Sequence, residues 1–415
     1  METNVRSVKI EKTTNLGAGV ARISGKTVFV DGAVKGDVAD IAITADRGRY
    51  DSARILNILS PSPHRVRPDC TSFSCGAASC GGCMFRHISY AHELEIKRDY
   101  ISSCFHKCGL DVEVGQFLTA GERAVRTKVT VPVGGGISGY YARGSHDIVP
   151  SVRCMLHDEM TDRIRRTVSV AGIGGVHHVT VRRGSEGTMV ILRAERDVPT
   201  DDGRLRALLH RLDAESIYLE RGGEYTLISG EPVIYDTLAG CRFRISPQSF
   251  YQVNHDCAEL LYTCAINTAS LTAGERLADL YCGTGTIGIA ASRHVPVSLT
   301  GIEIVPSAIE DAKTNACNNG VTADFICGDA VDYNGYADCV IVDPPRAGCG
   351  RRLLRHLTDV SPSRIVYVSC EPSTLARDAK ILADAHAYRI DSVAPVDMFP
   401  RTGKVECVAL LLREN

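Results

Sequence analysis

From about Cys257 to its carboxyl end, the sequence alternates short apolar runs with helix-like stretches. Such alternation is typical of a parallel sheet whose strands are joined by covering helices. The expected strands are residues 277–281, 299–304, 338–342, 364–369 and 405–412, with one more that ends near Asp329. In a sheet of this kind, ligands bind outside the carboxyl ends of the strands. We therefore predict an α/β, Rossmann-like domain over residues 251–415, with its site at that edge.

A glycine-rich turn follows the first of these strands. Residues 283–288 read Gly-Thr-Gly-Thr-Ile-Gly and lead into a helix of small residues. Glycines allow a tight turn from strand to helix and let a ligand approach the backbone closely. Glu303, near the end of the next strand, can accept hydrogen bonds from both ribose hydroxyls of an adenosine. The turn alone fits a nicotinamide cofactor, S-adenosylmethionine or a tight turn without a ligand.

A rigid acidic turn follows the fourth strand. Residues 343–346 read Asp-Pro-Pro-Arg. Prolines fix the backbone and remove amide donors, so this turn can hold a planar group against itself. Proline also occurs at strand ends for structural reasons. An acidic residue followed by two prolines at this place in the fold nevertheless indicates methyl transfer to a flat nitrogenous substrate.

A candidate nucleophile and a candidate base stand at the ends of two further strands. Cys370 lies between the strand 364–369 and a helix that opens at Pro372, a residue favoured in a first helical turn. The helix dipole there favours the thiolate, which is the reactive form of cysteine. Glu406 lies at the start of the last strand, where the alternation does not decide which face it occupies. From its position alone, Cys370 could equally be a buried, inert cysteine.

Four segments together resemble the RNA (uracil-5-)-methyltransferase family: residues 283–288, 343–346, 369–372 and 399–406. The likeness is strongest to the bacterial 23S ribosomal RNA branch, which carries a TRAM domain and an iron–sulfur cluster, whereas the tRNA branch lacks both. The resemblance implies that Cys370 adds to carbon 6 of uracil and activates carbon 5 for methylation. It also implies that Glu406 is the base that removes the carbon-5 proton, so that the thiolate can leave.

The resemblance further implies a set of cofactor contacts. The residues expected to bind S-adenosylmethionine are Gln252, Tyr281, Thr286, Glu303, Asp329 and Asp343. Thr286 stands where relatives often have Asn, and Asp329 is matched only through a short Gly-Asp-Ala segment. Lys404 stands where many relatives have His, which puts one substrate contact in doubt but leaves Glu406 in register.

A group of cysteines lies near the middle of the chain. Four thiolates can hold either zinc or an iron–sulfur cluster, and the single Cys-x2-Cys pair, Cys80 and Cys83, does not choose between them. The resemblance implies a [4Fe-4S] cluster held by Cys70, Cys80, Cys83 and Cys154. The gap between Cys70 and Cys80 exceeds the usual spacing of the family, so Cys75 is a rival first ligand. We expect a structural or RNA-shaping role for the cluster.

The rest of the chain suggests three domains. Residues 1–59 read as short strands separated by glycine turns and resemble a TRAM domain, an OB-like β-barrel that binds RNA. Residues 60–250 form a central α+β domain that carries the cluster. The candidate RNA-binding side chains of the barrel are Arg22, Lys26, Lys35, Arg47, Arg49, Phe29 and Tyr50. Acidic residues, namely Asp31, Asp37, Asp40 and Asp46, dilute this patch.

Composition constrains the setting and the partners. The formal net charge of −2 gives no global basic signal, so an RNA partner has to be bound by local patches. No apolar run approaches the length of a membrane span, and the first residues lack a signal-peptide core. We therefore expect a cytoplasmic monomer that contacts no membrane. There the 17 cysteines stay reduced, so the clustered ones suggest metal binding or catalysis.

Two other functions compete with this reading. An NAD-dependent oxidoreductase would use Glu303 for the ribose but would leave Cys370 and the Asp-Pro-Pro-Arg turn without roles. A non-catalytic RNA-binding protein with a metal-stabilised core would show no turnover. The preferred substrate is 23S ribosomal RNA, in which the target uracil has to be unstacked before carbons 5 and 6 become accessible.

Overall fold

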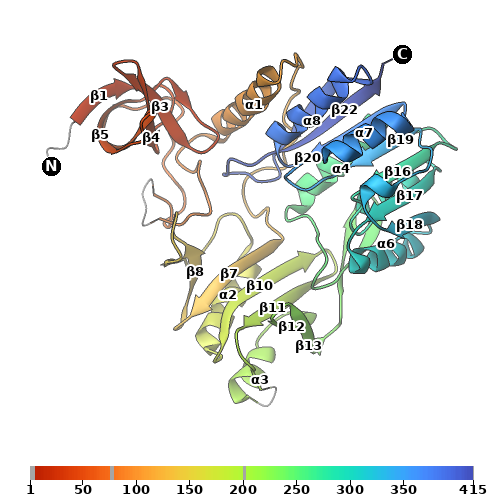
Figure 1. Cartoon of the computed structure of the whole chain (residues 1–415). Helices are drawn as coiled ribbons and strands as arrows, with labels where there is room; N and C mark the ends of the chain where they lie inside the picture. Colours follow the sequence, from red (N-terminus) through yellow and green to blue (C-terminus); the bar gives the residue numbers. More distant parts are fainter. Residues whose placement is uncertain (1–4, 75–78, 200–201, 415) are drawn as a thin grey trace. The chain divides into compact units, whose positions relative to one another are not determined.

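The computed structural model describes residues 5–74, 79–199 and 202–414. Its internal contacts divide the chain into two compact units. The first unit comprises Met1–Tyr100, Ser138–Met155 and Phe399–Lys404, and the second comprises Ile101–Ile137, Leu156–Met398 and Val405–Asn415. Helix α1 (Tyr90–Lys107) belongs in part to each unit (Figure 1). The division into domains at residues 59 and 250 stays a prediction.

The first unit begins with a curved sheet in the strand order β1-β5-β6-β4-β3-β2. Its strands are β1 (Val5–Lys9), β2 (Lys12–Thr13), β3 (Ala18–Ile23), β4 (Lys26–Asp31), β5 (Val38–Asp46) and β6 (Tyr50–Ser60). Alternation along β5 buries Ala39 and Ile41 and turns Asp40 toward solvent. The buried side chains form one core with residues of β3, β4 and β6. The amino-terminal β-domain expected from the sequence is therefore confirmed.

A buried ion pair fixes the end of this β-domain. Asp37 is fully buried, and its carboxylate accepts hydrogen bonds from Arg65 Nε at 2.8 Å and Arg65 Nη2 at 2.7 Å. The amides of Val34 and Ser62 donate to the same carboxylate. Burial alone would raise the pKa of Asp37, but these hydrogen bonds hold it below its usual value. Asp37 thus joins the sheet to the following segment. The expectation that it dilutes the basic surface patch of the barrel is wrong, because its side chain is buried.

The rest of the first unit holds the cysteine-rich segment and a short hairpin of β8 (Ile137–Tyr141) and β9 (Ile148–Pro150). Gly81 N donates to Tyr141 O at 2.9 Å, and Arg143 N donates to Ser79 O at 3.0 Å. These backbone bonds hold the Cys80 loop beside the hairpin that leads to Cys154.

The second unit contains an antiparallel-rich sheet and a parallel-rich sheet. The first has strands in the order β13-β12-β11-β10-β7. These are β7 (Lys128–Gly134), β10 (Val176–Gly184), β11 (Gly187–Ala194), β12 (Ser216–Arg221) and β13 (Glu224–Gly230), with α2 (Glu159–Ala171) and α3 (Gly203–Leu209) between them in sequence. A hairpin of β14 (Ile234–Leu238) and β15 (Cys241–Ile245) follows.

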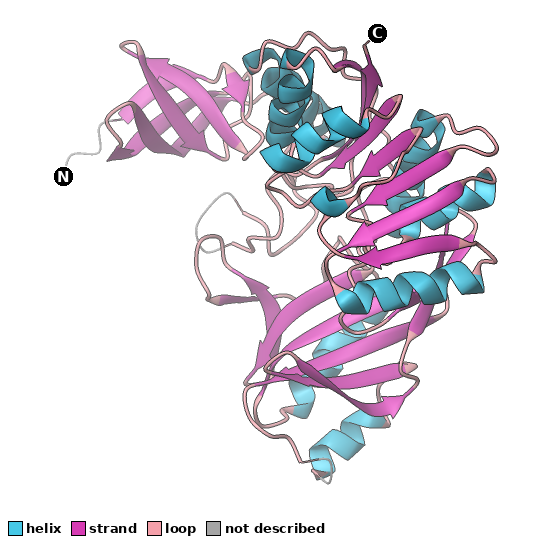
Figure 2. Cartoon of the chain, turned by 45° about the vertical axis from the view of Figure 1, so that its right-hand side comes forward, coloured by secondary structure: helices cyan, strands magenta, loops and turns pink. Residues whose placement is uncertain are grey.

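The parallel-rich sheet has the order β18-β17-β16-β19-β20-β22-β21, with helices on both of its sides (Figure 2). Its strands are β16 (Arg276–Leu280), β17 (Ser298–Glu303), β18 (Ala323–Cys327), β19 (Cys339–Val342), β20 (Arg364–Ser369), β21 (Tyr388–Val396) and β22 (Glu406–Arg413). Its helices are α4 (His255–Ala269), α5 (Thr286–His294), α6 (Pro306–Asn318), η1 (Ala330–Asp332), α7 (Arg351–Val360) and α8 (Pro372–Asp384). The doubly wound α/β fold expected from the sequence is confirmed.

The chain crosses from β19 to β20 through α7, but the crossover from β18 to β19 contains only the short η1. The last strand, β22, enters between β20 and β21 and is antiparallel to both. Within the described residues, no helix is at once long enough and apolar enough to cross a bilayer.

Candidate active site

The glycine turn after β16 is as tight as the sequence suggests. Tyr281, Gly283 and Gly285 have φ angles of 63°, 56° and 78°, in the left-handed region. Gly288 N donates to Asp279 Oδ2 at 3.0 Å, and a Cβ at Gly288 would lie 2.8 Å from that oxygen. Burial raises the pKa of Asp279 to about 7. The turn thus brings the start of α5 directly over the strand end.

Glu303 is held at the end of β17 by backbone amides. Its Oε2 accepts from Gly283 N at 3.2 Å, and its Oε1 accepts from Val305 N at 2.9 Å. Each carboxylate oxygen can accept a second hydrogen bond. The carboxylate is therefore oriented in advance and keeps acceptor capacity for two hydroxyl groups of a ligand.

Gln252 and Thr286, which are 34 positions apart, come together through a residue that the sequence analysis did not name. Tyr262 on α4 is buried, and its hydroxyl lies 3.1 Å from Thr286 Oγ1. A hydrogen bond with the Gln252 side chain also acts on Tyr262, whose pKa burial raises above its usual value. The three side chains form a polar chain beside the glycine turn.

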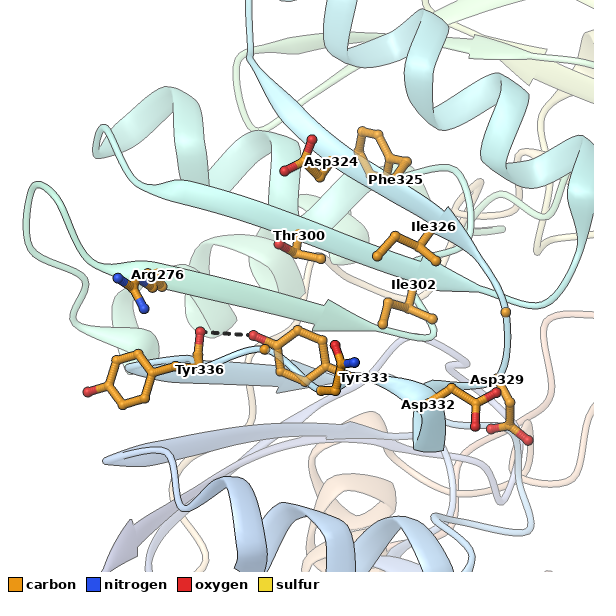
Figure 3. Close-up of a pocket in the computed structure, with 13 residues that line it drawn as sticks. Arg276, Thr300, Ile302, Asp324, Phe325, Ile326, Asp329, Asp332, Tyr333 and Tyr336 are labelled. Carbon is orange, nitrogen blue, oxygen red and sulfur yellow. Dashed lines mark hydrogen bonds between the residues drawn. The ribbon is translucent and has the colours of Figure 1, made fainter.

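Asp329 borders a hollow of about 560 Å³ on the sheet (Figure 3). The hollow runs from Asp329 and Asp332 past Ile302 to Arg276 and Tyr336. Arg276 opens β16, so the hollow leads away from the carboxyl ends of the strands. Glu303, Asp343 and Cys370 do not line it. Because the candidate chemistry lies at the strand ends, we do not assign the reaction to this hollow.

Cys370 and Glu406 stand opposite each other at the ends of two paired strands. Ser369 on β20 pairs with Cys407 on β22, so the next antiparallel pair along the ladder is Cys370 with Glu406. Glu406 is only 5% exposed, which shows that it faces the interior. Asp343, at the end of β19, is close enough for its charge to act on the Cys370 thiol. The structure therefore gathers the predicted nucleophile, the predicted base and the acidic turn.

The charges around Cys370 oppose one another. Burial raises the pKa of the Cys370 thiol, and the carboxylates of Glu406 and Asp343 raise it further. The guanidinium of Arg346 lowers this pKa by its charge and by a hydrogen bond. The net rise differs from the sequence expectation, in which the dipole of α8 alone favours the thiolate. Burial and the two neighbouring carboxylates are the causes of the rise in pKa.

Three comparisons bear on this arrangement. The family model described as tRNA (Uracil-5-)-methyltransferase matches residues 323–414, which contain Asp343, Cys370 and Glu406. The Methyltransferase small domain model matches residues 241–354, and the TRAM domain model matches residues 1–56. An uncharacterised RNA methyltransferase of Halalkalibacterium halodurans is 34% identical over 100% of this chain and 98% of its own length. The chain belongs to the RNA (uracil-5-)-methyltransferase family.

Other members of the family match along most of their length. An uncharacterised RNA methyltransferase of Clostridium tetani is 34% identical over 95% of this chain and 93% of its own. Among solved structures, the Pyrococcus abyssi tRNA (uracil-54, C5)-methyltransferase in complex with S-adenosyl-L-homocysteine has a TM-score of 0.79 and 27% identity. That match covers 98% of this chain and 99% of the other. A tRNA enzyme can therefore match this chain over both its β-rich amino-terminal part and its methyltransferase fold.

The cysteines that the family resemblance singles out lie in the first unit. The charges of Cys70 and Cys154 act on Cys80, and those of Cys80 and Cys154 act on Cys83, so the four side chains are neighbours. Even so, within residues 5–74, 79–199 and 202–414, no three or more His, Cys, Asp or Glu side chains are grouped closely enough to hold a metal ion. Cys75, the rival ligand, lies outside the described residues.

A buried cation beside these cysteines suits thiolate ligands. The Arg86 side chain is 1% exposed, and its Nη1 donates to Asp69 Oδ1 at 2.9 Å. Burial raises the pKa of Cys83 to about 11, and the charge of Arg86 opposes that rise. A hydrogen bond between the Arg86 and Cys83 side chains opposes that rise as well. The guanidinium beside Cys83 would stabilise a thiolate there, and cysteine thiolates are the donors that iron–sulfur clusters use.

The basic side chains of the β-domain are partly neutralised. Lys26 Nζ lies 2.8 Å from Asp46 Oδ1 and 2.5 Å from Asp51 Oδ1. Arg22 lies 3.9 Å from Glu11. The rings of Phe29 and Tyr50 meet edge to face with their centroids 5.2 Å apart, and Tyr50 is 40% exposed. The two proposed stacking residues thus form a single aromatic pair on β4 and β6.

Sequence reasoning missed several residues of this family site. Asp279 and Arg346 lay inside the quoted segments, and an acidic residue within an apolar strand was a usable signal for Asp279. Tyr262 lies in an ordinary amphipathic helix, and no local pattern marked it. Its role follows only from the contact with Thr286.

Proposed function

We propose that this protein methylates carbon 5 of a uridine in RNA through a covalent bond between Cys370 and carbon 6 of the uracil. The observation that carries the proposal is the opposition of Cys370 and buried Glu406 at the ends of β20 and β22. A nucleophile and a base that lie close together are what addition followed by proton removal requires.

The proposed reaction uses the side chains in sequence. The Cys370 thiolate adds to carbon 6, which places electron density on carbon 5. S-adenosylmethionine, when bound, supplies the electrophilic methyl group that carbon 5 attacks. Glu406 then takes the carbon-5 proton, and the Cys370 sulfur leaves as thiolate. Arg346 favours the thiolate at the start and again when the sulfur departs, because its charge lowers the pKa of Cys370.

The proposed cofactor site lies along the strand ends. Glu303 would accept hydrogen bonds from the ribose hydroxyls, and the glycine turn would receive the amino acid part of the cofactor. Gln252, Tyr281, Thr286, Asp329 and Asp343 are the remaining proposed contacts. The support is the oriented Glu303 carboxylate and the Gln252–Tyr262–Thr286 chain that borders the turn.

We propose 23S ribosomal RNA as the substrate, on the support of the cysteine group and the TRAM domain, which resemble that branch of the family. Transfer RNA is a second candidate, because the matching Pyrococcus abyssi structure is that of a tRNA (uracil-54, C5)-methyltransferase.

We also propose that Cys70, Cys80, Cys83 and Cys154 hold a [4Fe-4S] cluster in a central domain at residues 60–250. In the sequence this domain follows a β-barrel at 1–59 and precedes the methyltransferase domain at 251–415. The protein would act as a cytoplasmic monomer.

The test is methyl transfer from labelled S-adenosylmethionine to transcripts of the host's own 23S ribosomal RNA and tRNAs, with the modified base identified by mass spectrometry. We expect 5-methyluridine in 23S ribosomal RNA with the wild-type protein and none with Cys370→Ala. Label in tRNA alone would overturn the proposed substrate. Absence of 5-methyluridine from both RNAs would overturn the proposed reaction.

A further inference from the structure

Asp378 on α8 is a fully buried carboxylate that the proposed reaction does not use. Its Oδ2 accepts hydrogen bonds from Cys349 N at 2.7 Å and from the Tyr367 hydroxyl at 2.8 Å. Its Oδ1 accepts from Arg377 Nε at 2.8 Å. Three donors therefore converge on one buried carboxylate.

Two further hydrogen bonds from side chains of α8 fall on the same loop, residues 343–350, which carries the Asp-Pro-Pro-Arg turn. Arg377 Nη2 donates to Ala347 O at 2.7 Å, and Thr374 Oγ1 donates to Arg346 O at 3.2 Å. Gly348 has a φ of 78°, and a Cβ there would lie 2.5 Å from Asp378 Oδ2. Side chains of α8 are thus hydrogen-bonded to backbone atoms of Arg346, Ala347 and Cys349.

The held loop carries Arg346, whose charge and hydrogen bond act on the Cys370 thiol. Helix α8 begins at Pro372, two residues after Cys370, so one helix fixes both the nucleophile and the loop that carries the guanidinium. We propose that Asp378 is a positioning residue for methyl transfer: it locks the 343–350 loop so that the Arg346 guanidinium stays beside the Cys370 sulfur. The proposal rests on the proposed function only in taking Cys370 as the nucleophile.

Substitution by Asn should break this lock with little change of shape. An amide whose oxygen keeps the bonds from Cys349 N and the Tyr367 hydroxyl turns its NH2 group toward the Arg377 guanidinium, so the bond that aligns Arg377 with Ala347 O is lost. The loop would then loosen, and Arg346 would spend less time at the sulfur. The groups that face Cys370 are Arg346, Glu406 and Asp343. With Arg346 withdrawn, the two carboxylates dominate and the thiolate becomes harder to form.

The experiment measures the alkylation rate of Cys370 against pH in the full-length protein. Iodoacetamide labelling is followed by mass spectrometry of the tryptic peptide that runs from Ile365 to Arg377, which isolates Cys370 from the other cysteines. We expect Asp378→Asn to move the titration curve to higher pH. At any pH below the midpoint, the rate should fall about tenfold if the curve moves by about one pH unit, because only the thiolate reacts. Asp384→Asn is the matched control: Asp384 lies on the same helix but is exposed and pairs with Lys380.

A double substitution separates positioning from general weakening of the fold. Arg346→Gln should move the same curve, and adding Asp378→Asn to it should move the curve no further, since both act through Arg346. Additive displacements of the curve, or a folded Asp378→Asn protein with the wild-type curve, would overturn the proposal. If Asp378→Asn does not fold, Thr374→Ala should move the curve in the same direction, and an unmoved curve would overturn the proposal equally.

The outcomes also distinguish this proposal from the proposed function. If Cys370→Ala kept its methyltransferase activity, the proposed nucleophile would be wrong, whether or not Asp378→Asn changed the alkylation curve. If Cys370→Ala were inactive and Asp378→Asn left the curve unchanged, only the positioning role would fail.

Discussion

Replacing Glu303 by Ala removes the one carboxylate that backbone amides hold at the end of β17. In the proposed site this carboxylate accepts hydrogen bonds from two ribose hydroxyls. Hydrogen bonds to a charged acceptor contribute about 1.5–3 kcal/mol each. The side chain is only partly buried, so solvent replaces part of this and the pair should contribute about 1–3 kcal/mol. The expected loss of affinity for S-adenosylmethionine is therefore about 5- to 150-fold.

Isothermal titration calorimetry with S-adenosylhomocysteine measures this change directly. Glu303→Gln keeps the shape and one acceptor oxygen, so its affinity should fall between those of wild type and Glu303→Ala. Glu310→Ala is the matched control, because Glu310 is an exposed carboxylate on the neighbouring α6 that pairs with Lys313. A folded Glu303→Ala protein with wild-type affinity would refute the placement of the ribose at Glu303.

Two further predictions concern the first unit. Protein purified without oxygen should contain about four irons per chain, and Cys83→Ser should lose them, whereas Cys75→Ser should keep them; zinc in place of iron would contradict the cluster. Asp37→Asn should lower the free energy of unfolding of the β-domain by about 2–4 kcal/mol. The substitution removes the Asp37 carboxylate and leaves the Arg65 guanidinium without its ion-pair partner. The pKa of Asp37 is depressed in the folded state, so the wild-type advantage should be fully present at neutral pH and should decrease as the pH falls below the usual value of 3.8 toward the lower folded pKa. Urea unfolding of the two proteins at pH 7 and pH 3, with Asp46→Asn as a surface control, measures this difference, and an equal gap at both pH values would contradict it.

Much of the methyltransferase fold could be predicted because its signals are local. Buried parallel strands are short apolar runs, and the glycine turn needs glycines at fixed positions, as the φ angles of Gly283 and Gly285 show. Acidic residues at the strand ends could be singled out as candidates because ligands bind at that edge of such sheets. The sequence therefore predicts a site at Glu303 and Asp343, and the structure places both residues at the carboxyl ends of strands.

What the sequence could not predict depends on long-range pairing. The face occupied by Glu406 is set by the register of β22 against β20, whose last pair, Ser369 with Cys407, joins residues 38 positions apart. The burial of Asp37 depends on Arg65, which lies outside the predicted barrel. The pKa of Cys370 depends on burial and on charges from two separate segments, the 343–350 loop and Glu406, which a local pattern around Cys370 does not contain.

The most direct test of the central claim compares wild type, Cys370→Ala and Glu406→Gln on one natural RNA substrate, with Cys317→Ala as a control at an exposed cysteine. The thiolate of Glu406→Gln can still add to carbon 6, and carbon 5 can still take the methyl group, but the carbon-5 proton cannot be removed. We therefore predict that Glu406→Gln accumulates a methylated protein–RNA complex that survives denaturing electrophoresis, and that Cys370→Ala forms none. Normal turnover by Glu406→Gln without a covalent complex would contradict the claim that Cys370 and Glu406 are the nucleophile and the base.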